Sequence, residues 1–327
     1  MTESEVKDLG NELQRINNAH HIWLVTHERP DPDGLGAMLG LAEVLDQRGA
    51  STRLFAPHAI PEPYHFLVGW ERVEVAKAGH RPVGSAPDLV ILVDANLASR
   101  VGRWPKDMVA ISVDHHVATE ESIPGIIAPD RSSASELVYE LVEALGGHLT
   151  ASMAHNLYTG ILFDTRSFRF IQGHPRALVA AAALIPHGVD TELVFNALFT
   201  NLPASFLTLT QQFLETLRHE LKGSVAWGTV SMRTVQELGV DKALLQELLP
   251  FMLMVGDVQV AILYRELESG QFKASPRSKR AIDVRSIAER HGGGGHRNAA
   301  GVMLDMRPEE HVRFALPLLR SEIQANR

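Results

Sequence analysis

Carboxylate and imidazole side chains gather in four short segments that lie far apart in the chain. Their residues are His27, Asp31, Asp33, Asp94, Asp114, His115, His116 and Asp164. If these segments met, so many carboxylates would repel one another and raise one another's pKa unless a cation lay among them. Oxygen and imidazole donors suit Mn²⁺ or Mg²⁺. The sequence therefore predicts a divalent metal site.

The number of candidate ligands favours two ions over one. Two ions that share a carboxylate fit the set, and paired divalent ions about 3.5–4 Å apart are common at sites that attack phosphorus. Each segment also has an ordinary interpretation: Asp33 can cap the helix that starts at Gly34, and two adjacent histidines can pack in a core. Because all four segments occur together, we expect metal-assisted hydrolysis of a phosphoester.

Short apolar runs precede these polar residues and indicate buried strands. We expect strands at 21–26, 89–93 and 109–113, each followed by acids or histidines, while Asp164 closes the apolar segment 160–163. In open α/β sheets the ligand crevice lies at the carboxyl ends of the strands. The polar segments are therefore expected to meet at one edge of a sheet.

Helical patterns lie between and after these strands. Apolar residues recur at helical spacing in 34–47, 133–145, 151–163 and 175–186. Strands interleaved with helices predict an α/β domain with a mainly parallel sheet and helices on both faces. We assign residues 1–190 to this catalytic domain.

The pattern changes beyond residue 190. We expect a helical linker at 191–223 and a smaller α/β domain at 224–327, with the active-site cleft between the two domains. The expected elements of the smaller domain are strands at 224–232, 258–267 and 271–275 and a helix at 283–290. The first two strands alternate like antiparallel strands, and the third is expected to pair with the second across a turn.

A glycine-rich run in the smaller domain is the second candidate binding feature. It reads His291-Gly292-Gly293-Gly294-Gly295-His296-Arg297. Glycines expose backbone N–H groups and let a ligand approach closely, and the flanking basic groups suit phosphate. The alternative is a flexible surface loop. The basic cluster at 275–280 can equally be a solvated turn.

Composition narrows the functional classes. Hydrophobic residues make up 45% of the 327 residues, charged residues 21% and aromatic residues 6%. The absence of cysteine excludes disulfides, thiolate catalysis and cysteine-bound metals. A net charge of −8 and few aromatic residues argue against binding along a long nucleic acid strand. We expect a cytoplasmic protein without a membrane partner, because no apolar run approaches the ~20 residues of a membrane span and the first residues do not resemble a secretory signal.

Taken together, the motifs resemble those of the DHH phosphoesterase superfamily. The triplet Asp114-His115-His116 matches the motif that names it. The run from His27 to Asp33, Asp94 and Asp164-Thr165 match its other motifs, and the GGGGH run resembles the motif of the DHH-associated domain. The short chain is similar to the NrnA group of oligoribonucleases and pAp phosphatases, whereas RecJ exonucleases are usually longer.

The resemblance implies two Mn²⁺ ions, for which Mg²⁺ is a possible substitute. The first would be held by His27, Asp31 and Asp94. The second would be held by Asp33, Asp94, His115 and Asp164, so that Asp94 bridges the two ions. His116 would face the scissile phosphate, and Asp114 would orient the histidines. The far phosphate or nucleotide would be held by Arg277, Ser278, Gly293, Gly294, Gly295, His296 and Arg297.

Two positions depart from the family pattern. Asn96 stands where an aspartate often follows the bridging residue, and Arg166 replaces the glycine of an Asp-Thr-Gly motif. Neither change removes an expected ligand, although both could alter the choice of substrate.

The implied activity is hydrolysis of RNA or DNA oligonucleotides of two to five nucleotides to nucleoside monophosphates, and of pAp to AMP and phosphate. The alternatives are a linear or cyclic dinucleotide phosphodiesterase, a RecJ-like single-strand exonuclease, an inorganic pyrophosphatase and a non-catalytic nucleotide sensor. A homodimer is also open, because the apolar stretch 248–255 suits either a core or an interface.

Overall fold

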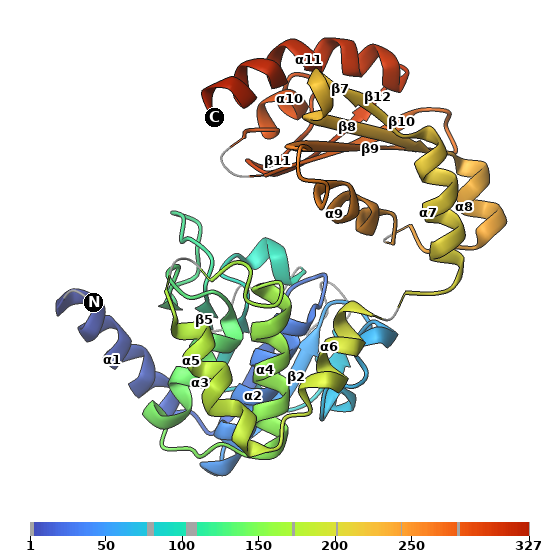
Figure 1. Cartoon of the computed structure of the whole chain (residues 1–327). Helices are drawn as coiled ribbons and strands as arrows, with labels where there is room; N and C mark the ends of the chain where they lie inside the picture. Colours follow the sequence, from blue (N-terminus) through green and yellow to red (C-terminus); the bar gives the residue numbers. More distant parts are fainter. Residues whose placement is uncertain are drawn as a thin grey trace. The chain divides into compact units, whose positions relative to one another are not determined.

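The structure of the chain is a computed structural model with two compact units, Met1–Asn201 and Leu202–Arg327 (Figure 1). It describes residues 3–76, 82–102, 110–171, 174–200, 202–242, 244–279 and 282–326, without the side chains of residues 3–9 and of His296. Each unit has its own sheet and its own apolar core. The expected linker, residues 191–223, contributes one helix to the first unit and another to the second.

A six-stranded parallel sheet forms the centre of the first unit, in the order β3-β2-β1-β4-β5-β6. The strands are β1 (His21–Val25), β2 (Ser51–Ala56), β3 (Val73–Val75), β4 (Leu89–Val93), β5 (Ala110–Asp114) and β6 (Gly125–Ile127). The three predicted strands are confirmed as β1, β4 and β5, except that residue 109 lies outside the described residues. The parallel sheet confirms the predicted α/β class.

Six α-helices are described in the first unit. They are α1 (Glu3–Asn18), α2 (Pro32–Gln47), α3 (Ala134–Ala144), α4 (Ala151–Asp164), α5 (Arg176–Leu184) and α6 (Thr191–Phe199). Helix α2 begins two residues before the predicted Gly34, because the side chain of Asp31 accepts hydrogen bonds from the backbone N–H groups of Asp33 and Gly34. Pro32 supplies a first helical residue whose missing N–H costs nothing there.

Helices α2 and α4 pack against each other through glycines. A Cβ on Gly36 would lie 2.3 Å from the carbonyl oxygen of Asn156, and a Cβ on Gly40 would lie 2.7 Å from Leu157. Asp33, near the start of α2, lies beside Gly160, whereas Glu43 accepts hydrogen bonds from Thr150 and Ser152 at the start of α4, so the two helices are antiparallel. The start of α2 therefore lies beside the end of α4, at Asp164.

The two faces of this sheet are covered differently. The larger apolar cluster contains buried side chains of α2, α3 and α4. The smaller cluster on the opposite face includes Trp23 and Val90, and η3 (Ala98–Val101) contributes Val101. Among the described residues this second cluster includes a 3-10 turn and no α-helix. The turn is short because Gly102, with φ at 70°, ends it.

The second unit contains a mixed six-stranded sheet in the order β11-β12-β10-β9-β8-β7. The strands are β7 (Arg218–Glu220), β8 (Val225–Val230), β9 (Val260–Glu266), β10 (Phe272–Ser278), β11 (Gly294–His296) and β12 (Ala299–Leu304). Strand β10 pairs with β9 in the predicted antiparallel manner. The antiparallel expectation is wrong for β8 and β9, which pair in parallel. The long connection between them contains helices and so permits a crossover.

Helices cover both faces of this second sheet. On one face lie α10 (Arg285–Glu289) and α11 (Pro308–Ala325), packed on Val260 and Tyr264. On the other lie α7 (Ser205–Thr216), α8 (Met232–Leu238) and α9 (Leu248–Leu253), packed on Ala261 and Leu263. The stretch 248–255 is divided: Leu248, Leu249 and Met252 are buried, whereas Met254 is 79% exposed. None of the described helices is long and apolar enough to cross a membrane.

Candidate metal centre

The central strands of the first sheet bring three of the polar segments together. β4 pairs with β1 on one side and with β5 on the other, and all three run in the same direction. His27, Asp94 and His115 follow the carboxyl ends of these strands within two residues. The start of α2 adds Asp31 and Asp33, and the end of α4 adds Asp164.

The first group of candidate ligands surrounds His27. Its Nε2 atom lies 3.2 Å from Asp94 Oδ2 and 3.6 Å from Asp31 Oδ2. One potential ligand atom from each of these residues lies within 4.8 Å of the other two. This group contains the three residues expected for the first ion.

The second group surrounds His115. Its Nε2 atom lies 3.5 Å from Asp94 Oδ1, 3.8 Å from Asp33 Oδ2 and 3.5 Å from Asp164 Oδ2. These are the four residues expected for the second ion. Asp94 therefore directs one carboxylate oxygen to each group, which is the position that a bridging ligand would take.

Buried polar atoms without hydrogen-bond partners show that these residues fit a cation. His27 Nε2 and Asp94 Oδ1 are buried, and neither makes a hydrogen bond. His115 Nδ1 lies 3.3 Å from the carbonyl oxygen of Arg131. If Nδ1 donates its proton there, Nε2 keeps its lone pair for the carboxylate cluster, as is usual for a histidine that binds a metal. The set of oxygen and imidazole donors fits a hard divalent ion.

The backbone at the start of α3 holds Asp33 in place. Its Oδ2 accepts a hydrogen bond from Ala134 N at 2.7 Å, and its Oδ1 accepts one from Ser135 N at 2.9 Å. The positive end of the α3 dipole favours a carboxylate at this position. A Cβ on Gly160 would lie 2.8 Å from Asp33 Oδ1. The glycine in α4 thus leaves the space that this carboxylate occupies.

The pKa values of three aspartates show how strongly the charges of the cluster interact. Burial raises the pKa of Asp33, and the charge of Asp94 raises it further. Burial likewise raises the pKa of Asp164 to about 6, against the opposing effect of His115. For Asp94, burial would raise the pKa, but the adjacent His115 and His27 hold it well below its usual range. The carboxylates therefore compete for positive charge in this cluster.

The two histidines supply positive charge when they are protonated. Burial would lower the pKa of His27, but the carboxylates of Asp31 and Asp94 outweigh it and raise the pKa to about 9. Burial would also lower the pKa of His115, but Asp94 and Asp33 raise it to about 10. A divalent cation can replace these protons, because a metal-bound imidazole must be neutral.

The backbone of Asp94 is itself unusual. Its φ of 56° lies in the left-handed region, which costs a residue with a side chain about 1 kcal/mol or more. Strained backbone of this kind persists where the surrounding structure holds it, and it is common at functional sites. The strain accompanies the turn that directs the carboxylate toward both histidines.

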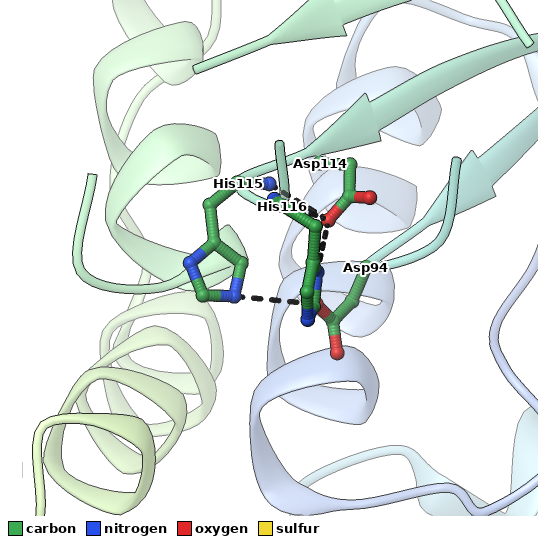
Figure 2. A group of neighbouring side chains, drawn as sticks. All are labelled: Asp94, Asp114, His115 and His116. Carbon is green, nitrogen blue, oxygen red and sulfur yellow. Dashed lines mark hydrogen bonds and ion pairs between the residues drawn. The ribbon is translucent and has the colours of Figure 1, made fainter. Parts of the chain in front are cut away.

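Asp114 contacts His116 and orients its ring (Figure 2). Asp114 Oδ1 accepts hydrogen bonds from the backbone N–H groups of His115 and His116, at 2.7 and 3.1 Å, and lies 2.8 Å from His116 Nδ1. Asp114 is fully buried, whereas the His116 side chain is 44% exposed. Arg100, which the sequence analysis did not identify, places Nη1 3.4 Å from His116 Nδ1.

Comparisons with known proteins agree with this centre. The sequence model of the DHH family, N-terminal domain, matches residues 21–161, and that of the DHHA1 domain matches residues 228–325. The bifunctional oligoribonuclease and PAP phosphatase NrnA of Thermus thermophilus is 30% identical over 86% of this chain and 84% of its own. The chain belongs to the DHH phosphoesterase family. The protein of the same name from Bacillus subtilis is 26% identical over 89% of this chain and 92% of its own.

Solved structures support the same fold. A crystal structure of an exopolyphosphatase-related protein from Bacteroides fragilis has a TM-score of 0.85 with 21% identity, and covers 98% of this chain and 100% of that one. At this identity the likeness shows the fold alone. As a member of the DHH family, the protein is a metal-dependent phosphoesterase with a candidate divalent metal site in its DHH domain.

The residues expected to bind substrate in the DHHA1 domain are only partly together. Arg277, Gly294 and Gly295 line one pocket of about 460 Å³. The described lining of this pocket does not include Ser278, Gly293 or Arg297. Arg280 and the side chain of His296 lie outside the described residues.

Two of the expected residues have structural contacts instead. Ser278 Oγ donates a hydrogen bond to the carbonyl oxygen of Ile282 and accepts one from Asn298. A Cβ on Gly293 would lie 2.4 Å from the carbonyl oxygen of Gly301, so Gly293 allows close packing against β12. Their roles in substrate binding remain predictions.

Proposed function

We propose that the protein hydrolyses short oligonucleotides of two to five nucleotides to nucleoside monophosphates, and pAp to AMP and phosphate, with two Mn²⁺ ions. The observation that carries the proposal is the position of Asp94 between two groups of ligands. One of its oxygens faces His27 and the other faces His115. The two NrnA relatives, each a bifunctional oligoribonuclease and PAP phosphatase, support the substrate class.

The residues would divide the work between them. His27, Asp31 and Asp94 would hold one ion, and Asp33, Asp94, His115 and Asp164 would hold the other. Such ions activate water for attack and neutralise charge on phosphate oxygens. Asp114 would hold the ring of His116 through Nδ1, which leaves Nε2 to donate a proton toward the leaving oxygen.

Binding groups in the DHHA1 domain would hold the far end of the substrate. Arg277 and the backbone of the glycine run offer donors for a phosphate or nucleotide. We propose that these contacts favour short substrates. The net charge of −8 supports local contacts with few phosphates over a long basic track.

A substrate panel tests this proposal. Purified protein with Mn²⁺ is given a 5′-labelled dinucleotide, a 24-mer and pAp, and products are separated over time. We expect rapid hydrolysis of the dinucleotide and of pAp and slow hydrolysis of the 24-mer. Faster degradation of the 24-mer would contradict the preference for short substrates and favour a RecJ-like exonuclease. Nucleotide binding without any product over a Mn²⁺ titration would favour a sensor.

A second candidate function comes from another relative. The cyclic-di-AMP phosphodiesterase GdpP of Geobacillus thermodenitrificans is 27% identical over 92% of this chain, which covers 48% of that protein. A linear or cyclic dinucleotide phosphodiesterase is therefore the alternative activity. Addition of cyclic di-AMP and its linear form to the panel distinguishes this alternative from the proposed function, because only the alternative predicts opening of the cyclic dinucleotide.

A further inference from the structure

Basic side chains lie on one face of β10, beyond the residues that the sequence analysis identified. Lys273, Ser275 and Arg277 alternate along this strand and therefore share a face of the sheet. All three line the pocket of about 460 Å³ in the second unit. On the neighbouring strand, Arg265 lies directly opposite Lys273 and lines the same pocket.

The charges of this pocket are unbalanced. Among its described lining residues, Lys242, Arg265, Lys273 and Arg277 are basic and none is acidic. Like charges that face each other across two strands destabilise a sheet. Arg265 and Lys273 have this arrangement, although both are half-buried. A bound anion would remove the repulsion.

The pocket has two ends with different contacts. At one end, Arg277 donates hydrogen bonds to Ala300 O at 3.0 Å and to Gln246 Oε1 at 3.2 Å. At the other end, neither the side chain of Arg265 nor that of Lys273 has a hydrogen-bond or ion-pair partner among the described residues, and Arg265 Nε is buried. Their donors are therefore available to a ligand, whereas those of Arg277 are partly used.

Ser275 lies between the two ends and supplies a further donor. Only 4% of the residue is exposed, yet its hydroxyl has no hydrogen-bond partner in the described part of the chain. Lys242 differs, because its Nζ lies 3.7 Å from Glu268 Oε1. Arg265, Lys273 and Ser275 thus form a distinct group of donors without partners.

We propose that Arg265, Lys273 and Ser275 form a second phosphate subsite, which binds an internal phosphodiester of substrates with three or more nucleotides. The inference rests on the proposed function. Four residues along a strand separate Lys273 from Arg277 by about 14 Å, which is longer than the distance between the two phosphates of one nucleoside bisphosphate. A trinucleotide can therefore reach the second subsite, whereas pAp cannot occupy both ends of the pocket.

Equilibrium binding to the full chain tests the subsite without hydrolysis. Isothermal titration calorimetry in EDTA measures dissociation constants for a trinucleotide, a dinucleotide, pAp and inorganic phosphate. The variants are Lys273→Gln and Arg265→Gln, with Lys273→Arg as the conservative change. Arg233→Gln is the matched control, because Arg233 is 84% exposed, pairs with Glu237 and lies outside the pocket lining.

We expect Lys273→Gln and Arg265→Gln to weaken trinucleotide binding about tenfold and pAp binding less than twofold. The slope of log affinity against log salt should fall by about 0.7 for the trinucleotide, as for the loss of one phosphate contact to a single strand. Lys273→Arg and Arg233→Gln should retain wild-type affinity.

Two outcomes would contradict the proposed subsite. One is an equal loss for trinucleotide and pAp, since pAp is too short to reach it. The other is a loss for inorganic phosphate alone, which would assign the site to free phosphate. Binding is measured without metal and without turnover. A chain that binds as expected but hydrolyses no oligonucleotide would contradict the proposed function and leave the subsite standing.

Discussion

The metal centre of the first unit and the basic pocket of the second differ in how neighbouring groups compensate their charged side chains. In the metal centre, buried carboxylates and histidines already face one another at 3.2–3.8 Å, and Asp33 is held by backbone N–H groups. In the basic pocket, four cationic side chains line a surface that has no acidic residue among its described lining residues. The first site is built to hold ions firmly, and the second is suited to a ligand that comes and goes.

This difference separates chemistry from selection. The metal centre determines whether a phosphoester is hydrolysed, because its ligands surround the positions that ions would take. The basic pocket would determine which phosphoester is bound, because its cations can only attract and position a ligand. Changes in the first unit should therefore affect every substrate alike, whereas changes in the pocket should affect substrates according to their length.

The largest effect is expected for the bridging carboxylate. Asp94→Ala should lower turnover on every substrate by at least about a thousandfold, because both groups of ligands lose a shared oxygen. Steady-state rates on the dinucleotide and on pAp measure the loss. Asp88→Asn is the matched control, since Asp88 lies at the other end of β4, where its side chain accepts hydrogen bonds from the backbone N–H groups of His20 and His21.

Asp88→Asn should retain activity within about threefold, because a surface substitution of this kind has a small effect. Equal losses in both variants would assign the effect to the folding of β4. Full activity in Asp94→Ala would contradict the bridging role.

A somewhat smaller effect is expected from the ions on stability. An ion that binds only the folded state stabilises it by about 4 kcal/mol at a thousand times its dissociation constant. Mn²⁺ should therefore raise the melting temperature of the first unit, where it relieves repulsion among Asp33, Asp94 and Asp164. Hydrogen exchange with and without Mn²⁺ should show added protection in β1, β4 and β5.

The same experiment distinguishes the two units. Peptides from β9 and β10 should exchange at unchanged rates, because the basic pocket offers no carboxylate to a cation. Protection in the second unit that equals that in the first would show that the ion acts elsewhere. Asp94→Ala serves as the second control and should lose most of the protection.

The sequence predicted most of what lies near the metal centre. Buried strands that end in acids or histidines carry two signals at once, an apolar run and a polar end, and β1, β4 and β5 were found for this reason. Arg100 and the N–H groups of Ala134 and Ser135 were missed. An arginine after a strand has no distinctive spacing, and a backbone donor leaves no signal in the residue type.

The second unit was harder to predict. β11 and β12 are rich in glycine and alanine, which have low strand propensity. Helix α11 contains Pro317, and proline has low helix propensity. The residue types therefore argue against each of these elements. Alternation in β8 and β9 shows which residues are buried but not whether the strands pair in parallel. Lys273 and Arg265 became a pair only through the register of β9 and β10. Such contacts depend on tertiary structure.

A pH effect of about 2 kcal/mol between pH 7 and pH 5 is expected in the second unit. Burial and, to a smaller extent, the neighbouring His291 together lower the pKa of His311 from 6.5 to about 4. Tyr264 Oη lies 2.7 Å from His311 Nδ1. Between pH 6.5 and 4 the unfolded chain binds the proton and the folded chain does not, so stability is lost as the pH falls through this window.

Urea unfolding at pH 7 and pH 5 measures this effect, with hydrogen exchange of α11 to identify the second unit. His311→Asn is the control and should flatten the pH dependence, because it removes the titrating ring. An unchanged pH dependence in His311→Asn would assign the effect to other groups.

The smallest effect is expected for the glycine that makes room for Asp33. In Gly160→Ala, the new Cβ would lie 2.0 Å from Ser135 Oγ and 2.8 Å from Asp33 Oδ1. Overpacking of this kind costs about 1–3 kcal/mol. The variant should also bind Mn²⁺ more weakly, because the carboxylate must move away from its backbone donors. Thermal unfolding and Mn²⁺ titration measure the two losses.

Gly10→Ala provides the matched comparison, because Gly10 also lies within a helix. A Cβ at Gly10 would meet nothing within 4 Å, so the higher helix propensity of alanine should stabilise the chain by about 0.5–1 kcal/mol. The two variants make the same chemical change with opposite expected signs. Destabilisation by both would mean that glycine in these helices is needed for a reason other than space. Stabilisation by both would show that Asp33 and Ser135 yield easily, and that the metal centre is less rigid than its backbone hydrogen bonds imply.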